Sequence, residues 1–266
     1  MSEALTAPPG ALLPHSRASA LVASALVFLL LAACTGTARP AASLAPVARI
    51  VKPLSGPEVY GAWRDTGTPS VALTFDDGPD PVYTPRILDV LHRHGVKATF
   101  CVVGSRVGKY PTLVRRIVAE GHTLCNHSWR HRRDLGTQTE AVIRADLTKT
   151  NQAILRAAPD AKVSYFRAPY GAFSQRLVTV AERMAMTSIY WSVDTKDWDA
   201  GRYGRGPAMV RHIVDAVRHN TRPGSIILAH DLRKPDTIVA IDRVLPWLKA
   251  HFAVAPLPVS DISARS

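Results

Sequence analysis

Short apolar runs alternate with longer amphipathic stretches from Val71 onward, and this alternation constrains the fold more than any other feature of the sequence. Apolar or β-branched runs closed by Gly or Pro predict strands, and apolar residues at helical spacing predict helices. Alternating strands and helices imply a parallel sheet with helices outside it. Seven predicted strands favour an α/β fold, a distorted (β/α) barrel that is closed or nearly closed and smaller than an eight-stranded one.

The predicted elements follow one another without an internal repeat. Strands are expected at 71–75, 98–103, 122–125, 163–167, 187–193, 225–229 and 252–255. Helices are expected at 84–93, 110–120, 139–157, 174–184, 208–220 and 237–250. The polar clusters of the sequence fall just after the strands. Because the carboxyl ends of parallel strands meet at one end of the sheet, we expect a site there.

The length and composition favour one folded domain. A chain of 266 residues, 47% of them hydrophobic, can bury a single large core, and we place that domain at 70–260. Residues 34–69 are expected to form a flexible linker and N-terminal extension, because 35–46 is rich in Ala, Pro, Thr and Ser and has no hydrophobic period.

The first 33 residues are typical of a targeting segment. Arg17 precedes an apolar run at 21–33, which fits a signal peptide and is shorter than the ~20 residues of a membrane-spanning helix. The run ends in Leu-Ala-Ala-Cys, which resembles the lipobox of bacterial lipoproteins. That resemblance implies cleavage before Cys34, lipidation of Cys34 and a tether outside the cytoplasmic membrane. An ordinary signal peptide followed by an incidental cysteine is the alternative.

The formal net charge of +12 favours acidic partners such as nucleic acid, anionic lipid or an anionic cell-wall polymer. Apart from a cluster at 130–133, the basic residues are scattered and match no nucleic-acid motif. We therefore expect no nucleic-acid partner. We also expect a monomer.

Two cysteines besides Cys34 lie in predicted strands that can be neighbours, Cys101 and Cys125. An exported protein can oxidise such a pair. A disulfide, however, requires Cα atoms within about 7 Å, which a sequence does not reveal. We expect two buried free thiols.

Two adjacent carboxylates, Asp76 and Asp77, close the first predicted strand and precede Gly78 and Pro79. The four residues are also good turn formers, since Asp bends the backbone, Gly accepts a positive φ and Pro fixes φ. The acids therefore indicate either a simple turn or a site at the end of the strand.

Two histidines four residues apart, His127 and His131, follow the third predicted strand. On one helical turn both imidazoles would face the same way and could share a metal ion. Together with an aspartate, they match the three protein ligands of catalytic zinc, which leave one position open. A chance pair on the surface is the alternative.

Further clusters end the later strands. Arg167 ends the fourth, and either holds a site carboxylate ionised and oriented or forms an ordinary structural salt bridge. Asp194 and Asp197 follow the fifth, together with Trp198, which is either a sugar platform or part of the core. His230 directly follows the sixth, as a structural or a catalytic residue.

Taken together, the five clusters resemble the polysaccharide deacetylase family, or NodB-homology domain, over roughly 70–258 and in the family's order. The matching motifs are Thr74-Phe75-Asp76-Asp77-Gly78, His127-Ser128-Trp129-Arg130-His131, Arg167-Ala168-Pro169-Tyr170-Gly171, Asp194-Thr195-Lys196-Asp197-Trp198 and Leu228-Ala229-His230. This resemblance implies a distorted (β/α) barrel that removes N- or O-acetyl groups from sugars with one divalent metal ion.

The resemblance also assigns roles to residues. Asp77, His127 and His131 would bind the metal, expected to be Zn²⁺ with Co²⁺, Mn²⁺ or Ni²⁺ as alternatives, and Asp76 would be the general base. His230 would be the general acid. The other implied roles are support of His230 by Asp197, with Asp194 as the alternative, pairing of Arg167 with Asp76, an oxyanion contact from the backbone N–H of Tyr170, a sugar wall at Trp198 and an acetyl methyl pocket at Leu228.

The expected function is therefore a membrane-tethered, metal-dependent deacetylase that acts on N-acetylglucosamine units of peptidoglycan or of a chitin-like or exported glycan. An O-acetyl esterase for xylan-like substrates and a non-catalytic glycan-binding lipoprotein are the alternatives. A two-carboxylate glycosidase fits less well, because its acids flank the bond from separate strands. Here the acids are adjacent and the histidines would have no role.

Overall fold

The structure is a computed structural model that describes residues 60–258. The expected signal peptide at 1–33, the lipidation of Cys34 and most of the expected linker lie outside the described residues. Within the described range, none of the helices has the length and hydropathy needed to cross a membrane.

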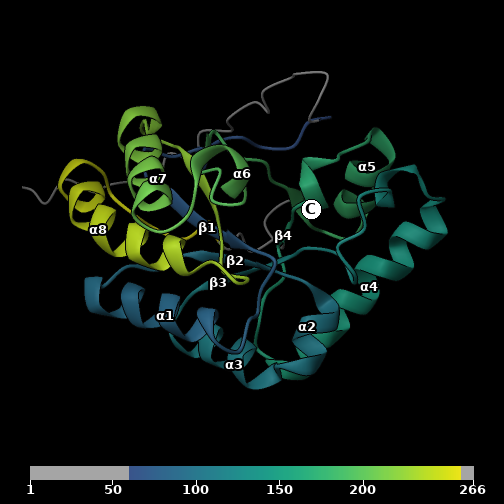
Figure 1. Ribbon diagram of the computed structural model, residues 1–266. Coiled ribbons are helices and arrows are strands. Elements are labelled where there is room, and N and C mark those ends of the chain that lie inside the picture. Colours follow the sequence, from purple (N-terminus) through teal and green to yellow (C-terminus); the bar gives the residue numbers. More distant parts are fainter. Residues whose placement is uncertain (1–59, 259–266) are drawn as a thin grey trace, which may run out of the picture. The chain divides into compact units, whose positions relative to one another are not determined.

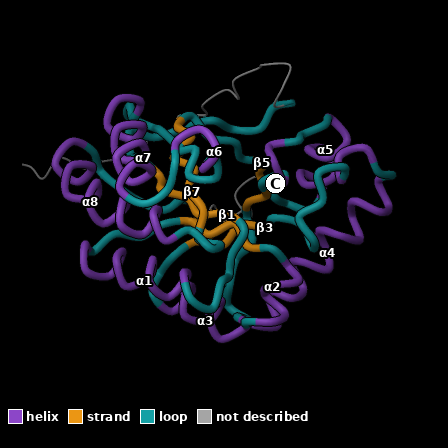
Figure 2. Tube along the Cα trace, viewed as in Figure 1, coloured by secondary structure: helices purple, strands orange, loops and turns teal. Residues whose placement is uncertain are grey.

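Seven parallel strands form one sheet, in the order β5-β4-β3-β2-β1-β7-β6. The strands are β1 (Ala72–Asp76), β2 (Thr99–Val102), β3 (Thr123–Asn126), β4 (Tyr165–Phe166), β5 (Thr187–Ser188), β6 (Val193–Asp194) and β7 (Ile226–His230). Figure 2 shows them in orange in the middle of the domain, with the helices around them. The predicted fold, a distorted (β/α) barrel in a single domain, is confirmed.

Eight α-helices are assigned in the described range: α1 (Tyr83–His94), α2 (Gly104–Lys109), α3 (Pro111–Ala119), α4 (Glu140–Ala157), α5 (Gln175–Arg183), α6 (Ala200–Tyr203), α7 (Pro207–Asn220) and α8 (Pro235–His251). Figure 1 shows α8, α1, α3, α2 and α4 following one another around the outer side of the strands. The short helices α2 and α6 were not predicted, because neither is long enough to show a helical period.

The predicted strand at 187–193 is wrong, because it is two strands on opposite edges of the sheet. Only four residues join β5 to β6, a link that spans at most roughly 18 Å. The edges of a flat seven-stranded sheet would be about 29 Å apart. The sheet must therefore curl. Trp63 helps to hold the segment between β5 and β6, because its backbone N–H donates to Ser188 O at 2.9 Å and its carbonyl accepts from Tyr190 N at 2.6 Å.

The predicted strand at 252–255 is also wrong. Only an isolated parallel bridge forms there, between Val254 and Val71. The segment leaves α8 at Phe252 and exchanges two backbone hydrogen bonds with Val71. The apolar run at 252–255 therefore packs against the domain but does not pair along its length as a strand of the sheet.

Side chains of the strands alternate between two hydrophobic layers. One layer, which includes Phe75 and Phe100, packs against the surrounding helices, and their rings lie 5.2 Å apart. The other layer gathers Ala72, Cys101, Cys125 and further residues inside the curl. Period-two alternation puts each strand's residues on both faces, so the sheet is buried on both sides.

Cys101 and Cys125 form a disulfide, and the expectation of free thiols is wrong. The register of β2 and β3 pairs these two residues directly. Both side chains point into the curl, and their Cα atoms lie 4.2 Å apart. Register, which a single sequence does not show, decides the pairing.

Candidate active site

The candidate site is built at the carboxyl ends of the strands, where the polar clusters were expected. Asp76 is the last residue of β1 and is paired in register with His230, the last residue of β7. Asn126 ends β3 and is paired with Phe166 of β4, which places His127 beside Arg167. Four strands thus bring residues far apart in sequence to one end of the sheet.

The two histidines lie on a loop, so the expected helical turn between them is wrong. Ser128 and His131 adopt positive φ values of 63° and 54°. Asn126 Oδ1 accepts from Ser128 N, and Ser128 Oγ accepts from His131 N, each at 2.9 Å. These side-chain bonds hold a tight non-helical turn. The imidazole rings of His127 and His131 nevertheless meet, with centroids 4.9 Å apart.

Asp77, His127 and His131 form the group of possible metal ligands found among the described residues, each offering an atom within 4.8 Å of the others. Asp77 Oδ1 lies 3.0 Å from His131 Nε2 and 3.5 Å from His127 Nε2. Among the described residues, this buried oxygen nevertheless has no well-directed hydrogen bond. Convergent atoms without a directed bond between them, on one carboxylate and two imidazoles, suit a divalent cation of the zinc type.

The backbone carbonyl of Arg167 fixes the orientation of His127, since it lies 2.8 Å from Nδ1. That contact holds a proton on Nδ1 and directs Nε2 toward Asp77. Burial opposes ionisation of Asp77, but the nearby imidazoles of His127 and His131 outweigh burial and hold its pKa well below the usual range. The triad therefore offers an ionised carboxylate and an oriented imidazole.

The second carboxylate, Asp76, has different partners. Its side chain is buried, and its Oδ1 accepts from Arg167 Nη1 at 2.7 Å. Arg167 is fully buried as well and donates from Nη1 to Thr74 Oγ1 at 2.8 Å and from Nη2 to Tyr190 O at 2.9 Å. Asp76 Oδ2 faces His127 Nε2 at 3.7 Å. Arg167 thus holds Asp76 at the edge of the triad.

His230 pairs with Asp197, the acid favoured from the sequence. His230 Nδ1 lies 2.6 Å from Asp197 Oδ1, and Asp197 Oδ2 accepts from His230 N and Thr237 Oγ1. Asp194 instead accepts from the backbone N–H of Lys196. Burial lowers the pKa of His230, but the charge of Asp197 overrides burial and raises it to about 9. This imidazole is therefore a cation at neutral pH.

Three residues expected to contact a substrate differ in exposure. Trp198 is 51% exposed and Tyr170 is 58% exposed, which rules out the core position considered for Trp198. Tyr170 has φ 59°, and its ring lies 4.5 Å from that of His131. Leu228 is buried and lies two residues before His230 on β7, so both side chains point to the same face.

A buried acid that sequence reasoning left without a role, Asp231, supports the turn after Asp77. Its Oδ2 accepts from Thr84 Oγ1, while Oδ1 has no hydrogen-bond partner within the described range. A Cβ on Gly78 would lie within 2.4 Å of this carboxyl. Burial raises the pKa of Asp231 to about 7. Its position directly after His230 was the available signal.

Comparison with known proteins decides the family. Residues 64–189 match the model of the polysaccharide deacetylase family. The chain is 42% identical over 206 residues to a chitooligosaccharide deacetylase of Sinorhizobium fredii, covering 73% of this chain and 92% of that relative. The chain belongs to the polysaccharide deacetylase family.

Solved structures similar to this polysaccharide deacetylase support the same family assignment. A peptidoglycan N-acetylglucosamine deacetylase, crystallised with a benzamide compound, is 36% identical with a TM-score of 0.65, covering 72% of this chain and 87% of that one. A family 4 carbohydrate esterase from Streptomyces lividans, in complex with acetate, is 31% identical with a TM-score of 0.63, covering 72% and 93%. The resemblance inferred from the five motifs is confirmed at the level of family.

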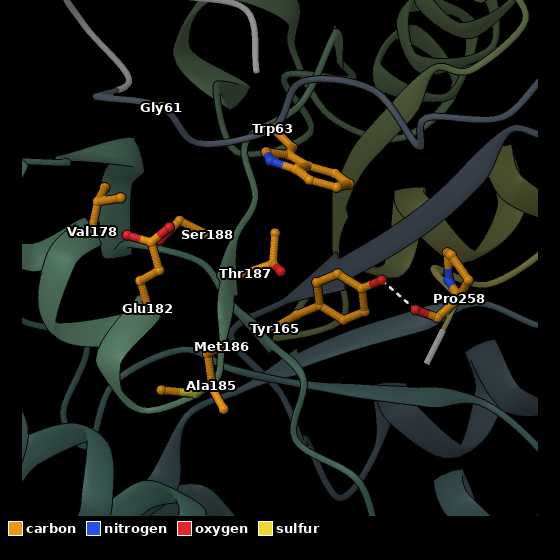
Figure 3. A pocket seen from close by; sticks show the side chains of 10 residues that line it. All are labelled: Gly61, Trp63, Tyr165, Val178, Glu182, Ala185, Met186, Thr187, Ser188 and Pro258. Carbon is orange, nitrogen blue, oxygen red and sulfur yellow. Dashed lines mark hydrogen bonds between the residues drawn. The ribbon is translucent and has the colours of Figure 1, made fainter. Parts of the chain in front are cut away.

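One cavity of the deacetylase, of about 340 Å³, lies away from these residues. It is beside the first residues of β4 and β5, at the opposite end of the strands from the candidate site. Figure 3 shows Trp63, Tyr165 and Pro258 on one side of it and Val178 and Glu182 of α5 on the other. Its lining offers no cluster of acids and histidines like the one at the other end of the sheet.

Proposed function

We propose that this deacetylase removes acetyl groups from N-acetylglucosamine units of a glycan of the chitooligosaccharide or peptidoglycan type, in a metal-dependent reaction. The observation that carries the proposal is the convergence, at one end of the sheet, of the Asp-His-His triad, the Asp76–Arg167 pair and the Asp197–His230 pair. The chitooligosaccharide and peptidoglycan deacetylases among the similar proteins support this choice of substrate.

Asp77, His127 and His131 would hold one divalent ion. Zn²⁺ is the first choice, and Co²⁺, Mn²⁺ and Ni²⁺ accept the same donors. When bound, such an ion polarises an acetyl carbonyl and lowers the pKa of a water molecule. The ionised state of Asp77 and the fixed tautomer of His127 suit the ligand role.

Asp76 is the proposed general base. Arg167 occupies its Oδ1, so Oδ2 remains to take the proton of the water that attacks the acetyl carbon. One acid is thus committed to the cation while its neighbour is left for proton transfer. A general base of this kind contributes about 10² to 10⁴ in rate.

The attack places negative charge on the acetyl oxygen, and the backbone N–H of Tyr170 is proposed to stabilise it. Loss of one such donor costs about 10² to 10³ in rate. His230 then donates a proton to the departing sugar amine. Its pKa of about 9, raised by Asp197 against the effect of burial, keeps that proton available at neutral pH.

Two further residues would receive the sugar. Trp198, half-exposed beside Asp197, offers a ring face to the pyranose. Leu228, on the same face of β7 as His230, would line the pocket for the acetyl methyl group. Neither residue can exchange a proton, so both act in binding.

The proposed location is outside the cytoplasmic membrane, tethered through a lipid on Cys34. The lipobox-like sequence supports this location, and so does the disulfide, because disulfides persist in oxidising compartments. Detergent partitioning of the wild-type protein and of Cys34→Ala tests the tether. Loss of the detergent-phase protein in the variant is expected, and equal partitioning would contradict it.

The deciding experiment measures acetate released from acetylated chitotetraose, peptidoglycan fragments and acetylated xylan, with and without a chelator. We expect release from the N-acetylated glycans, loss with chelator and recovery on adding Zn²⁺. Release from xylan alone would favour an O-acetyl esterase. Absence of acetate from every substrate, with metal bound, would favour a glycan-binding protein without catalysis.

A further inference from the structure

A small cavity of about 220 Å³ adjoins the candidate site on the side of Trp198. Asp197 and Trp198 form one wall, and the segments that lead into α7 and α8 form the other. The cavity therefore shares a residue with the His230 pair, yet extends away from it. A group on a sugar next to the reacting one would enter this space.

Three cations line the cavity: Arg205, Arg233 and Lys234. Lys234 Nζ donates to the carbonyl of Asp197 at 3.2 Å. The guanidinium groups of Arg205 and Arg233 are exposed, and neither forms an ion pair with another described residue. Two arginines thus line the cavity without an ion pair to a described acid.

The acids of the same cavity are already engaged. Asp236 Oδ2 accepts from the backbone N–H of Gly206 at 2.9 Å. Asp197 is paired with His230 and accepts from Thr237. Asp236 keeps its charge, but three cations line the cavity against two acids, one of them paired with His230, so the net charge of the lining is positive.

We propose that this cavity binds an anionic substituent, a carboxylate or a phosphate, on the sugar next to the one that is deacetylated. Arginine recognises both groups because its guanidinium donates two parallel hydrogen bonds to an oxyanion. The space holds several water volumes of about 30 Å³ each, which is enough for such a group. The inference rests on the proposed function and narrows it to anionic glycans.

The net charge of the chain points the same way. A formal charge of +12 raises the local concentration of an acidic polymer around the molecule. The two arginines would convert this general attraction into a contact at a defined place beside Trp198. A neutral chitin-type chain would leave them in water.

The test compares tetrasaccharides of equal length in the full-length protein. One is the neutral tetramer of N-acetylglucosamine, a second alternates N-acetylglucosamine with N-acetylmuramic acid that bears a free lactyl carboxylate, and a third carries 6-phosphate on alternate sugars. We expect a KM at least tenfold lower for an anionic substrate at low salt. The two anionic arms distinguish the carboxylate source from the phosphate source.

The double variant Arg205→Gln/Arg233→Gln should bring the ratio of anionic to neutral KM close to one. The matched control is Arg156→Gln/Arg218→Gln, which removes two exposed cations from the last turns of α4 and α7, at the other end of the sheet. The control should keep the wild-type ratio. Equal KM values for neutral and anionic substrates in the wild-type protein, or equal ratios in the two double variants, would overturn the inference.

Calorimetric binding of the same oligosaccharides to Asp76→Asn separates this inference from the proposed function. If no substrate releases acetate, the proposed function fails. Tighter binding of the anionic oligosaccharide, lost in the Arg205 and Arg233 variant, would still support the cavity. Equal binding of the neutral and anionic oligosaccharides would overturn it even if acetate is released.

Discussion

Asp197 Oδ1 lies 2.6 Å from His230 Nδ1, and this contact sets the protonation of the imidazole. Burial alone would lower the pKa of His230, yet the pair raises it from 6.5 to about 9. The native protein therefore holds a proton that the unfolded chain releases between these two values. The stabilising effect of the pair is complete below pH 6.5 and is lost as the pH rises through about 9.

The first prediction concerns Asp197→Asn. Without the carboxylate charge, the pKa of His230 should fall and the basic limb of kcat/KM, expected near pH 9, should move to lower pH. At pH 8 the loss should be about 10²-fold, within the range of a general acid. Asp194→Asn, whose carboxylate binds a backbone N–H instead, is the control. If the basic limb did not move, the contact with Asp197 would not be what sets the pKa of His230.

Substitutions of the two adjacent acids should separate turnover from metal binding. Asp76→Asn should lower kcat at least about 10²-fold and keep the metal, because only Asp77 belongs to the triad. Asp77→Asn and His127→Ala should lose the metal. Elemental analysis and acetate release measure both, with Asp215→Asn on α7 as an exposed control. If Asp76→Asn emptied the site, the two acids would have exchanged roles.

Gly78→Ala should destabilise the protein by about 1–3 kcal/mol through overpacking. The added Cβ would lie within 2.4 Å of the Asp231 carboxyl, which is buried and held by Thr84. The double variant Gly78→Ala/Asp231→Ser should recover part of the loss in chemical denaturation. Gly108→Ala is the control, since its Cβ would meet a single atom at 3.9 Å. Equal stability of the two single variants would refute the clash.

Trp198→Ala should raise KM for the glycan about tenfold and leave kcat nearly unchanged. The ring is half-exposed, so its loss should change the free energy of unfolding by only about 0.5 kcal/mol. For Trp247→Ala on α8 we expect a loss of stability and an unchanged KM, because that ring packs against the core and lies far from the site. A loss of stability without a change in KM for Trp198→Ala would assign it a structural role.

The disulfide should be detectable in the native protein. Alkylation without reductant, followed by digestion and mass spectrometry, should leave the peptides of Cys101 and Cys125 linked. The variant Cys101→Ser/Cys125→Ser should lower the unfolding free energy by about 2–4 kcal/mol. Two alkylated thiols in the untreated protein would contradict the bridge.

The order of motifs predicted where these residues gather because strand ends are local features. Asp76, His127, Arg167 and His230 each follow or end an apolar run, and parallel pairing brings such ends together. The sequence shows where each strand ends but not which strand lies beside it. The fold class and the gathering of these residues at one end of the sheet were therefore predictable from the amino-acid pattern.

Two of the errors come from pairing between distant segments, and a third comes from local side-chain hydrogen bonds. The run at 187–193 has the hydropathy of one strand, but Trp63 pairs within it and the sheet order divides it. Cys101 meets Cys125 through the register of β2 and β3. The loop between the histidines depends on side-chain bonds from Asn126 and Ser128. None of these contacts leaves a periodic signal.

Arg167 reaches both proposed halves of the chemistry, through its guanidinium to Asp76 and through its carbonyl to His127. Mutagenesis can delete only the first of these, because every residue placed at this position keeps a carbonyl. Replacing the side chain would thus reduce proton transfer and leave the orientation of His127 unchanged. Displacing the end of β4, in contrast, would move the base and the ligand together. The proposed general base and one proposed metal ligand therefore both depend on the backbone position of this one residue.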